Sequence, residues 1–428
     1  MTKSLISTLI AAMMALVSFA ANAQAYGNAD TRQKVFNKNI RTIKVAPRSN
    51  EYLPPIVTIG SDDVIKISFD ELAEDRRYLQ YSVTHCNADW QPSNLNEAEY
   101  LDGFNLGDIE EYQFSSATFT HYVHYAFYLP NDQLRITRSG NYLVKVFPED
   151  DPDNALFQAR FYVCQGSANL RASVTSRTDI DYNNHMQQLE VNANFPTAGV
   201  VTDPYNDLKL YVRQNMRDDN AVAIFHPSIV NDINVEYTHC RDLIFPASNE
   251  FRRIETVSIH SFSMGVEKMR YFEPYYHAEL RIDFPRNDQQ YLYDETQYGR
   301  FTIREADSDE SDVQADYVVT HFTLNTAGPL DGGRLYIDGE MTGHVFDSNS
   351  LMKYNSSTGC YECALLLKQG AYNYQYLWIP DGQTVGNTAK VEGDYYETIN
   401  EYFVLLYKRA PTDRADTLVA FAITFSGK

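Results

Sequence analysis

The sequence predicts an all-β protein built from tandem immunoglobulin-like or E-set-like antiparallel β-sandwiches with few short helices. Three observations support this fold class. Apolar and polar residues alternate with a period of two in one segment after another, as in strands with one buried face. Turn-forming residues recur at intervals of about ten residues, which is typical of sandwiches. The 32 Tyr and 23 Phe also favour pleated sheet surfaces.

The alternation is clearest in five segments: four have apolar side chains on one face and polar side chains on the other, and the last has a stripe of Tyr and Trp. No amphipathic segment with a helical period extends beyond about three turns, so the sequence lacks the helices that cover a parallel sheet. The five segments are 65–70, 189–195, 208–213, 278–284 and 372–378.

Residues 1–23 have the composition of a secretory signal peptide. Lys3 precedes an apolar run from Leu9 to Phe19, and Ala21-Asn22-Ala23 supplies the small residues of a cleavage site. The run is shorter than the ~20 apolar residues that cross a bilayer, which disfavours a transmembrane anchor. We therefore expect an exported protein with no membrane span. We also expect no lipid anchor, because no Cys follows the small residues.

At about 150 residues per domain, the remaining chain predicts two to four domains. An acidic stretch, EADSDESDVQAD, reads as a linker between the last two. Its rival interpretation is a calcium loop, but an EF-hand starting at Asp307 has Asp312 and Val318 where Gly and Glu are required. The expected units are an extension (24–40), a first sandwich (41–166), a second β-rich domain (167–304), the linker (305–316) and a third sandwich (317–428).

Charge and cysteine content restrict the partners and cofactors. A formal net charge of −21 repels phosphate backbones, so nucleic acid is not expected as a partner. The five Cys include a CxxC pair, Cys360 and Cys363, but structural zinc needs four ligands. Residues three apart in a strand also point to opposite faces. We expect small buried or half-buried thiols and no metal or cofactor.

The most distinctive stretch is HCNADWQPSNLNEAEYLDGF, residues 85–104. A strand over 78–86 places His85 and Cys86 on opposite faces, so they cannot act as base and thiolate. Asn94, with Glu97 three residues later, predicts a capping box for one short helix through Leu101. The stretch is therefore predicted to be a strand-to-helix corner, structural or in contact with a partner, and not an active site. Its main residues are His85, Cys86, Asp89, Trp90, Pro92, Tyr100 and Gly103.

The chain contains none of the local motifs of catalysis. GxSxG, HExxH and a glycine-rich phosphate loop are all missing from the sequence. We therefore expect a protein that is not an enzyme. A hydrolase whose carboxylates come together only on folding is a further possibility that a sequence does not reveal.

The third unit resembles the glycogen-binding-like sandwich modules of glycan-processing enzymes. The resemblance lies in VVTHFTL, GRLYIDGEMTG and the hairpin that ends in GAYNYQYLW. It implies that sugars could stack on Trp378 and nearby tyrosines, which makes a periplasmic glycan-binding module the alternative function. The competing interpretation is that these aromatic residues form the core of the sandwich. Where such modules carry an aromatic-rich loop, GEMTGHVFDS has only Phe346.

The 85–104 stretch also resembles the signature of the plug-protein family of the type IX secretion system. The resemblance covers nearly the whole mature chain. There are two departures: Ala247-Ser248 stands where the family usually has Gly-Gly, and Gln297-Tyr298-Gly299 where an Asn-Gly turn is usual. The further matching segments are THYVHYAFYLPND, SGNYLVKVFPED, NEFRRIETVSI, MKYNSSTGCYECALLLKQGAYNYQYLW and EGDYYETINEYFVLLYKR.

The resemblance implies a non-enzymatic periplasmic protein of Bacteroidota. Such a protein binds the large outer-membrane β-barrel translocon of type IX secretion. It occludes the periplasmic mouth of the barrel when no cargo is being exported. We expect a monomer when free, with a negative surface that favours a basic rim on the partner.

Overall fold

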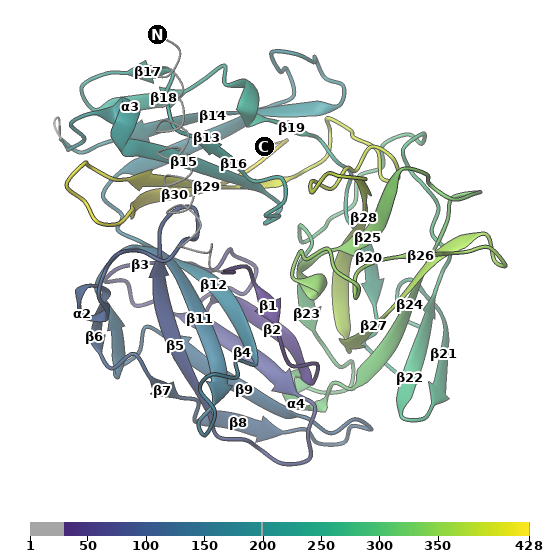
Figure 1. Cartoon of the computed structure of the whole chain (residues 1–428). Coiled ribbons are helices and arrows are strands. Elements are labelled where there is room, and N and C mark those ends of the chain that lie inside the picture. The colour runs from purple at the N-terminus through teal and green to yellow at the C-terminus, as the bar shows by residue number, and fades with distance from the viewer. Residues whose placement is uncertain (1–29, 198–199, 428) are drawn as a thin grey trace, which may run out of the picture.

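The computed structural model describes residues 30–197 and 200–427, in which the chain forms three β-sandwiches packed against one another (Figure 1). The predicted all-β class is confirmed. The predicted signal peptide, residues 1–23, lies outside the described residues. Within the described ranges, no helix has the length and apolar character needed to cross a bilayer.

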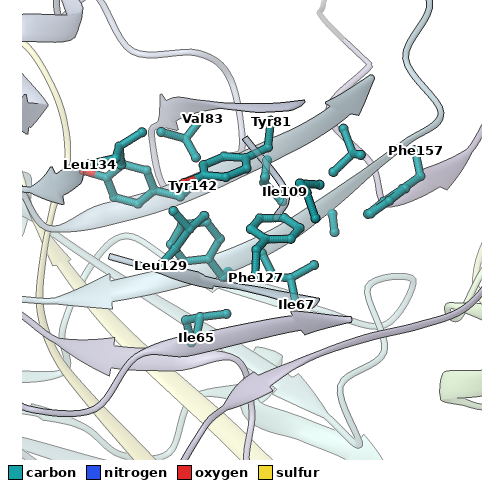
Figure 2. Packing of buried hydrophobic residues seen from close by; sticks show 14 of the residues in the cluster. Ile65, Ile67, Tyr81, Val83, Ile109, Phe127, Leu129, Leu134, Tyr142 and Phe157 are labelled. Atoms are coloured by element: carbon teal, nitrogen blue, oxygen red, sulfur yellow. The ribbon is translucent and has the colours of Figure 1, made fainter. Parts of the chain in front are cut away.

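The first sandwich contains two facing sheets. One has the order β1-β12-β11-β5-β7, with β3 beside β12, and the other the order β2-β4-β9-β8. Alternate residues of β4 and β9 point into the core, where Ile65, Ile67 and Phe127 meet Tyr81 and Phe157 (Figure 2). The elements are β1 (Lys34–Val35), β2 (Ile40–Pro47), β3 (Ile56–Thr58), β4 (Ile65–Glu71), β5 (Leu79–Cys86), α2 (Glu97–Tyr100), β6 (Leu101–Gly103), β7 (Gly107–Asp108), β8 (Glu111–Phe114), β9 (Val123–Leu129), β10 (Leu134–Ile136), β11 (Gly140–Pro148) and β12 (Phe157–Cys164).

The second sandwich is closed by the C-terminal hairpin. One sheet has the order β13-β14-β18-β17, with β19 beside β14, and the other the order β16-β15-β29-β30. The elements are β13 (Asn169–Thr175), β14 (Met186–Asn194), α3 (Pro204–Asp207), β15 (Leu208–Gln214), β16 (Val222–Ile224), β17 (Ile229–Val230), β18 (Asn234–Tyr237), η1 (Arg241–Leu243), β19 (Ile244–Pro246), β29 (Glu401–Lys408) and β30 (Thr417–Phe425).

The third sandwich is centred on the long strand β28. Strands β20, β23 and β25 all pair with β28, and the facing sheet has the order β21-β22-β24-β27-β26. The elements are β20 (Arg252–Glu255), β21 (Val266–Phe272), β22 (Tyr275–Leu280), β23 (Phe301–Ile303), β24 (Tyr317–Asn325), β25 (Gly333–Asp338), η2 (Glu340–Thr342), β26 (Lys353–Asn355), β27 (Cys360–Lys368) and β28 (Gly370–Pro380).

The strand pairing distributes the chain differently from the ranges 167–304 and 317–428. Strands β20 to β23, which precede residue 305, belong to the third sandwich, and β29 and β30 return to the second. In β29, Tyr402, Val404 and Leu406 pack into the second sandwich. Phe403, Leu405 and Tyr407 face the first. A strand buried on both faces shows no polar alternation, so its sequence does not identify its partner.

The acidic stretch 305–316 makes contacts between two sandwiches. It contains α4 (Ser311–Gln314), at the base of the molecule between the first and third sandwiches (Figure 1). The Val313 carbonyl accepts the backbone N–H of Ser116 at 2.9 Å. The buried Asp316 carboxylate accepts the backbone N–H groups of Phe119 and Thr120 at 2.6 and 3.0 Å. The last residues of this acidic stretch therefore connect the first and third sandwiches.

Candidate functional site

The 85–104 corner begins on the last two residues of β5, whose side chains point to opposite faces. His85 is buried against Tyr100 and Tyr142, with ring centroids 5.6 and 5.2 Å away. Its Nε2 donates to the Ser139 carbonyl at 3.1 Å, because a carbonyl can only accept, and Nδ1 accepts from the Ser93 hydroxyl at 2.9 Å. Burial lowers the pKa of His85, so the ring is a neutral structural group.

Cys86 is also buried and carries no reactive thiolate. Burial raises the pKa of this thiol to about 12. The same cause raises the pKa of Cys164 to about 11. All five Cys are free, three buried and two partly buried. The corner therefore has no nucleophile of the cysteine type.

The short helix after the strand begins two residues later than the sequence predicts. Asn96 rather than Asn94 is the N-cap of α2, and its backbone N–H donates to Glu99 at 2.8 Å, not to Glu97. Asn94 with Glu97 and Asn96 with Glu99 have the same spacing, so the local sequence pattern does not distinguish the two possible caps. Tyr100 ends the helix and is buried, and burial raises its pKa to about 12. Gly103 follows with a φ of 114°.

Trp90 lies where the first and second sandwiches meet. It has a φ of 64°, in the left-handed region. The Arg160 guanidinium lies 4.2 Å from the centre of its ring, and Tyr162 packs edge-on at 5.2 Å. Asp89 and Pro92 are exposed on the same turn, where Asp89 accepts the backbone N–H of Gln91 at 3.0 Å and Pro92 bridges to Cys86.

This turn binds the loop between β29 and β30. The backbone N–H of Ala88 donates to Asp416 at 3.0 Å, and the backbone N–H of Asp416 donates to the Asn87 side chain at 3.1 Å. Lys209 of the second sandwich pairs with the same carboxylate at 2.7 Å. From the loop, Arg414 also pairs with Glu99 at 2.8 Å. Asp416 and Arg414 are not predictable from the sequence, since nothing local connects them to residues so far away in the chain.

Around these polar contacts lies an apolar joint between the first two sandwiches. It is completed by a hydrogen bond from the Tyr407 hydroxyl to Asn141, 2.6 Å long. The signature corner is therefore a joint between sandwiches. The residues of the apolar joint are Ile56, Ala88, Tyr162, Cys164, Phe403, Leu405, Tyr407 and Leu418.

The joint between the first and third sandwiches is ionic. Lys368 pairs with Asp70 at 2.6 Å, and both side chains are almost fully buried. Asp70 also accepts from the Tyr317 hydroxyl at 2.7 Å and lies 2.7 Å from Nδ1 of His124. Burial acts to raise the pKa of Asp70, but the charges of Lys368 and His124 hold it below its usual value. These four residues form the ionic joint.

All three sandwiches meet around a cavity of about 90 Å³. Each contributes one arginine: Arg160 from the first, Arg213 from the second and Arg300 from the third. Arg160 and Arg213 pair with Asp218 at 3.0 and 2.7 Å. Arg300 pairs with Glu401 at 2.7 Å. Because these cations already have protein partners, the cavity is a polar junction rather than an anion site.

Two features expected of other functions do not fit the structure. In residues 30–197 and 200–427, no three His, Cys, Asp or Glu side chains come together as metal ligands. Trp378 is only 3% exposed, and the tyrosines of its strand are buried with it. Sugar stacking on Trp378 is therefore wrong, because its faces are covered by the core of the third sandwich and by Lys390, 4.1 Å from the ring centre.

The fold and its joints define an all-β protein of three sandwiches in close contact, in which the 85–104 corner is part of the joint between the first two. The family described as "Type 9 secretion system plug protein 1st domain" matches residues 40–165. The crystal structure of a hypothetical protein from Parabacteroides merdae is 41% identical, with a TM-score of 0.90. The match covers 92% of this chain and 99% of that one. The chain belongs to the type IX secretion system plug protein family.

Other comparisons add nothing on function. Among curated proteins, none matches this chain. The DNA-bound alkylpurine DNA glycosylase AlkC of Pseudomonas fluorescens is 10% identical, with a TM-score of 0.18 over 29% of this chain and 30% of that one. A similarity this low gives no information about the fold or function of this chain. Family membership links the chain to type IX secretion and to the cell envelope.

Proposed function

We propose that this protein is a non-enzymatic periplasmic plug. It binds the periplasmic mouth of the outer-membrane translocon barrel and occludes it when no cargo is in transit. Family membership supports the link to secretion. The joints between the sandwiches support the mode of action, because a stopper must keep its shape while one side faces a wide opening.

The observation that carries the mode of action is the ionic joint. Lys368 and Asp70 are 1% and 0% exposed, and they belong to different sandwiches. Both side chains are buried only while the two sandwiches are in contact, and the ion pair, together with the hydrogen bond from Tyr317 to Asp70, fixes their relative orientation. The apolar joint holds the second sandwich to the first by hydrophobic burial. The chain thus acts as one body without chemistry, by shape and surface.

A permeability assay tests the proposal directly. In a strain that lacks the protein, the outer membrane should admit large solutes that the parent strain excludes, because the idle barrel stays open. Wild-type protein supplied in trans should restore the barrier, and a tagged copy should co-purify with the barrel in mild detergent. An intact barrier in the deletion strain, with normal levels of the barrel, would refute occlusion.

A further inference from the structure

The loop Gly103–Gly107, with the sequence GFNLG, exposes two large apolar side chains. It joins β6 to β7 at the edge of the first sandwich that faces away from the third (Figure 1). Phe104 is 87% exposed and Leu106 is 50% exposed. Phe104 is the most exposed large apolar side chain among the described residues. Neither residue contributes to a core.

The loop is held rigidly by the residue between them. Asn105 accepts the backbone N–H of Val83 at 2.8 Å and donates to the Val83 carbonyl at 2.9 Å. Its amide thus takes the place of a neighbouring strand beside β5. It donates also to Glu97 at 2.7 Å. With the centre of the loop fixed on the sheet edge, the side chains before and after it are kept outside.

Both flanking glycines are required by close contacts. Gly103 has a φ of 114°, and a Cβ atom there would lie 2.0 Å from the Gln133 carbonyl oxygen. A Cβ atom on Gly107 would lie 2.2 Å from Cζ of Tyr81, a buried core side chain. Such a loop loses little conformational entropy when it is bound, which is the condition for an efficient binding element.

The charges around the loop indicate the chemistry of its partner. Residues 97–111 contain six carboxylates and no Lys, Arg or His. Arg414 pairs with one of them, Glu99, and Arg135 lies opposite Asp102 in the β6–β10 pair. An acidic border around an aromatic tip complements an apolar pocket bordered by Lys and Arg. The same border opposes adsorption to anionic lipid.

We propose that Phe104 and Leu106 are the anchor that this protein inserts into a basic-rimmed apolar pocket of a protein partner. This inference rests on the proposed function, which makes the translocon barrel that partner. The anchor fixes the position of the plug, while the sandwiches supply the obstruction. Aromatic side chains, Phe among them, are enriched in the cores of protein interfaces, and a preorganised loop lowers the entropic cost of binding.

The test compares the double variant Phe104→Ser/Leu106→Ser with a matched surface control. Leu292→Ser removes a side chain that is 80% exposed on a loop of the third sandwich. Tagged wild-type protein and the control should recover equal amounts of the barrel in mild detergent. The double variant should recover at least roughly ten times less, equivalent to ~1.4 kcal/mol. All three proteins should unfold at the same temperature, because the altered side chains are outside the core.

A third variant tests whether the rigidity of the loop contributes to binding in addition to its exposed apolar side chains. Asn105→Ala keeps Phe104 and Leu106 but releases the loop from Val83, so its recovery of the barrel should be intermediate. Equal recovery by the double variant and the wild type overturns the anchor and leaves the proposed function standing. Failure of the wild type itself to recover the barrel removes the proposed function, and the anchor with it.

A lipid control tests whether the loop binds a membrane surface instead of a protein. The wild type should not sediment with vesicles of phosphatidylethanolamine and phosphatidylglycerol. Sedimentation that is lost in the double variant would show that the loop inserts into membrane, and would overturn a protein partner for it.

Discussion

The first sandwich contacts its two neighbours through joints with different buried centres, one apolar and one ionic. Its contact with the second is an apolar joint, in which Phe403, Leu405 and Tyr407 of β29 pack on Tyr162 and Cys164 of β12. Its contact with the third is an ionic joint, in which Lys368 reaches across to Asp70. Apolar burial contributes in proportion to area, so it weakens gradually. A buried ion pair depends on both partners being present, so it fails abruptly.

The difference shows which joint can respond to conditions. The apolar joint consists mainly of uncharged side chains, so its contribution to stability changes little with pH. The ionic joint depends on ionised groups in a site without solvent. We therefore expect changes at the ionic joint to be the more severe, and acid to weaken the third sandwich and its joint before the apolar joint.

The largest effect is expected from Lys368→Met. The substitution leaves Asp70, which is 0% exposed, without its main counter-charge. The free energy of unfolding should fall by about 3–5 kcal/mol, measured by urea denaturation at pH 7. A loss below about 1 kcal/mol would mean that solvent reaches the joint.

The double variant Lys368→Met/Asp70→Asn provides the control for this prediction. Removing the second charge should recover part of the lost stability, because no uncompensated carboxylate is then buried. If the double variant is no more stable than Lys368→Met, the loss comes from packing and not from charge.

The next largest effect is expected from Leu405→Ala in the apolar joint. Leu405 is 1% exposed, and its truncation leaves a cavity between the first and second sandwiches. Stability should fall by about 2–4 kcal/mol. Cys164 of the same joint should also react faster with a thiol reagent, as the joint opens more often. Unchanged labelling of Cys164 would place the damage elsewhere.

The smallest effect is expected from mild acid. In the third sandwich, burial acts to raise the pKa of Glu392, but the charges of Arg252 and Arg286 lower it from 4.5 to about 2. A carboxylate whose pKa is lowered by folding stabilises the fold at pH values above its pKa in the unfolded chain. This contribution is lost as the pH falls toward its pKa in the folded protein. Between pH 6 and pH 3, unfolding free energy should decrease by about 2 kcal/mol from this group alone.

Urea denaturation at the two pH values measures this decrease, and Glu392→Gln is the reference. The variant is less stable at pH 6, but its stability should fall less on acidification. Equal slopes in both proteins would assign the acid response to other carboxylates. Asp70, whose pKa is also held below its usual value, is then the first to replace by Asn.

Much of the fold is predictable from local pattern. The alternating segments 65–70 and 208–213 correspond to β4 and β15, and the all-β class follows from them. The corner at 85–104 is also recognisable, because Pro92 disfavours the continuation of a strand and the Asn and Glu residues have the spacing of a capping box. The cap shifts from Asn94 to Asn96 because both residues satisfy the same rule.

Strand partners are not predictable in this way. Alternation shows which face of a strand is buried, but not which strand lies beside it. Gly370–Pro380 illustrates this, since β28 is shared by three other strands and buried along most of its length. Trp378 therefore has the same sequence signature whether it is a core residue or a sugar platform. The role of Asn105 is hidden for a similar reason, because its partner Val83 is on another strand.

The position of β29 and β30 has a consequence during synthesis. Leu210 pairs with Leu406, so half of one sheet in the second sandwich is made only after all the strands of the third sandwich. Until then, β15 has no neighbour on that side, and the apolar joint has only the half supplied by the first sandwich. A chain interrupted after Pro380 would retain the strands of its first and third units yet present an open hydrophobic seam to proteases. We therefore expect a chain that lacks β29 and β30 to be degraded faster than one that contains them.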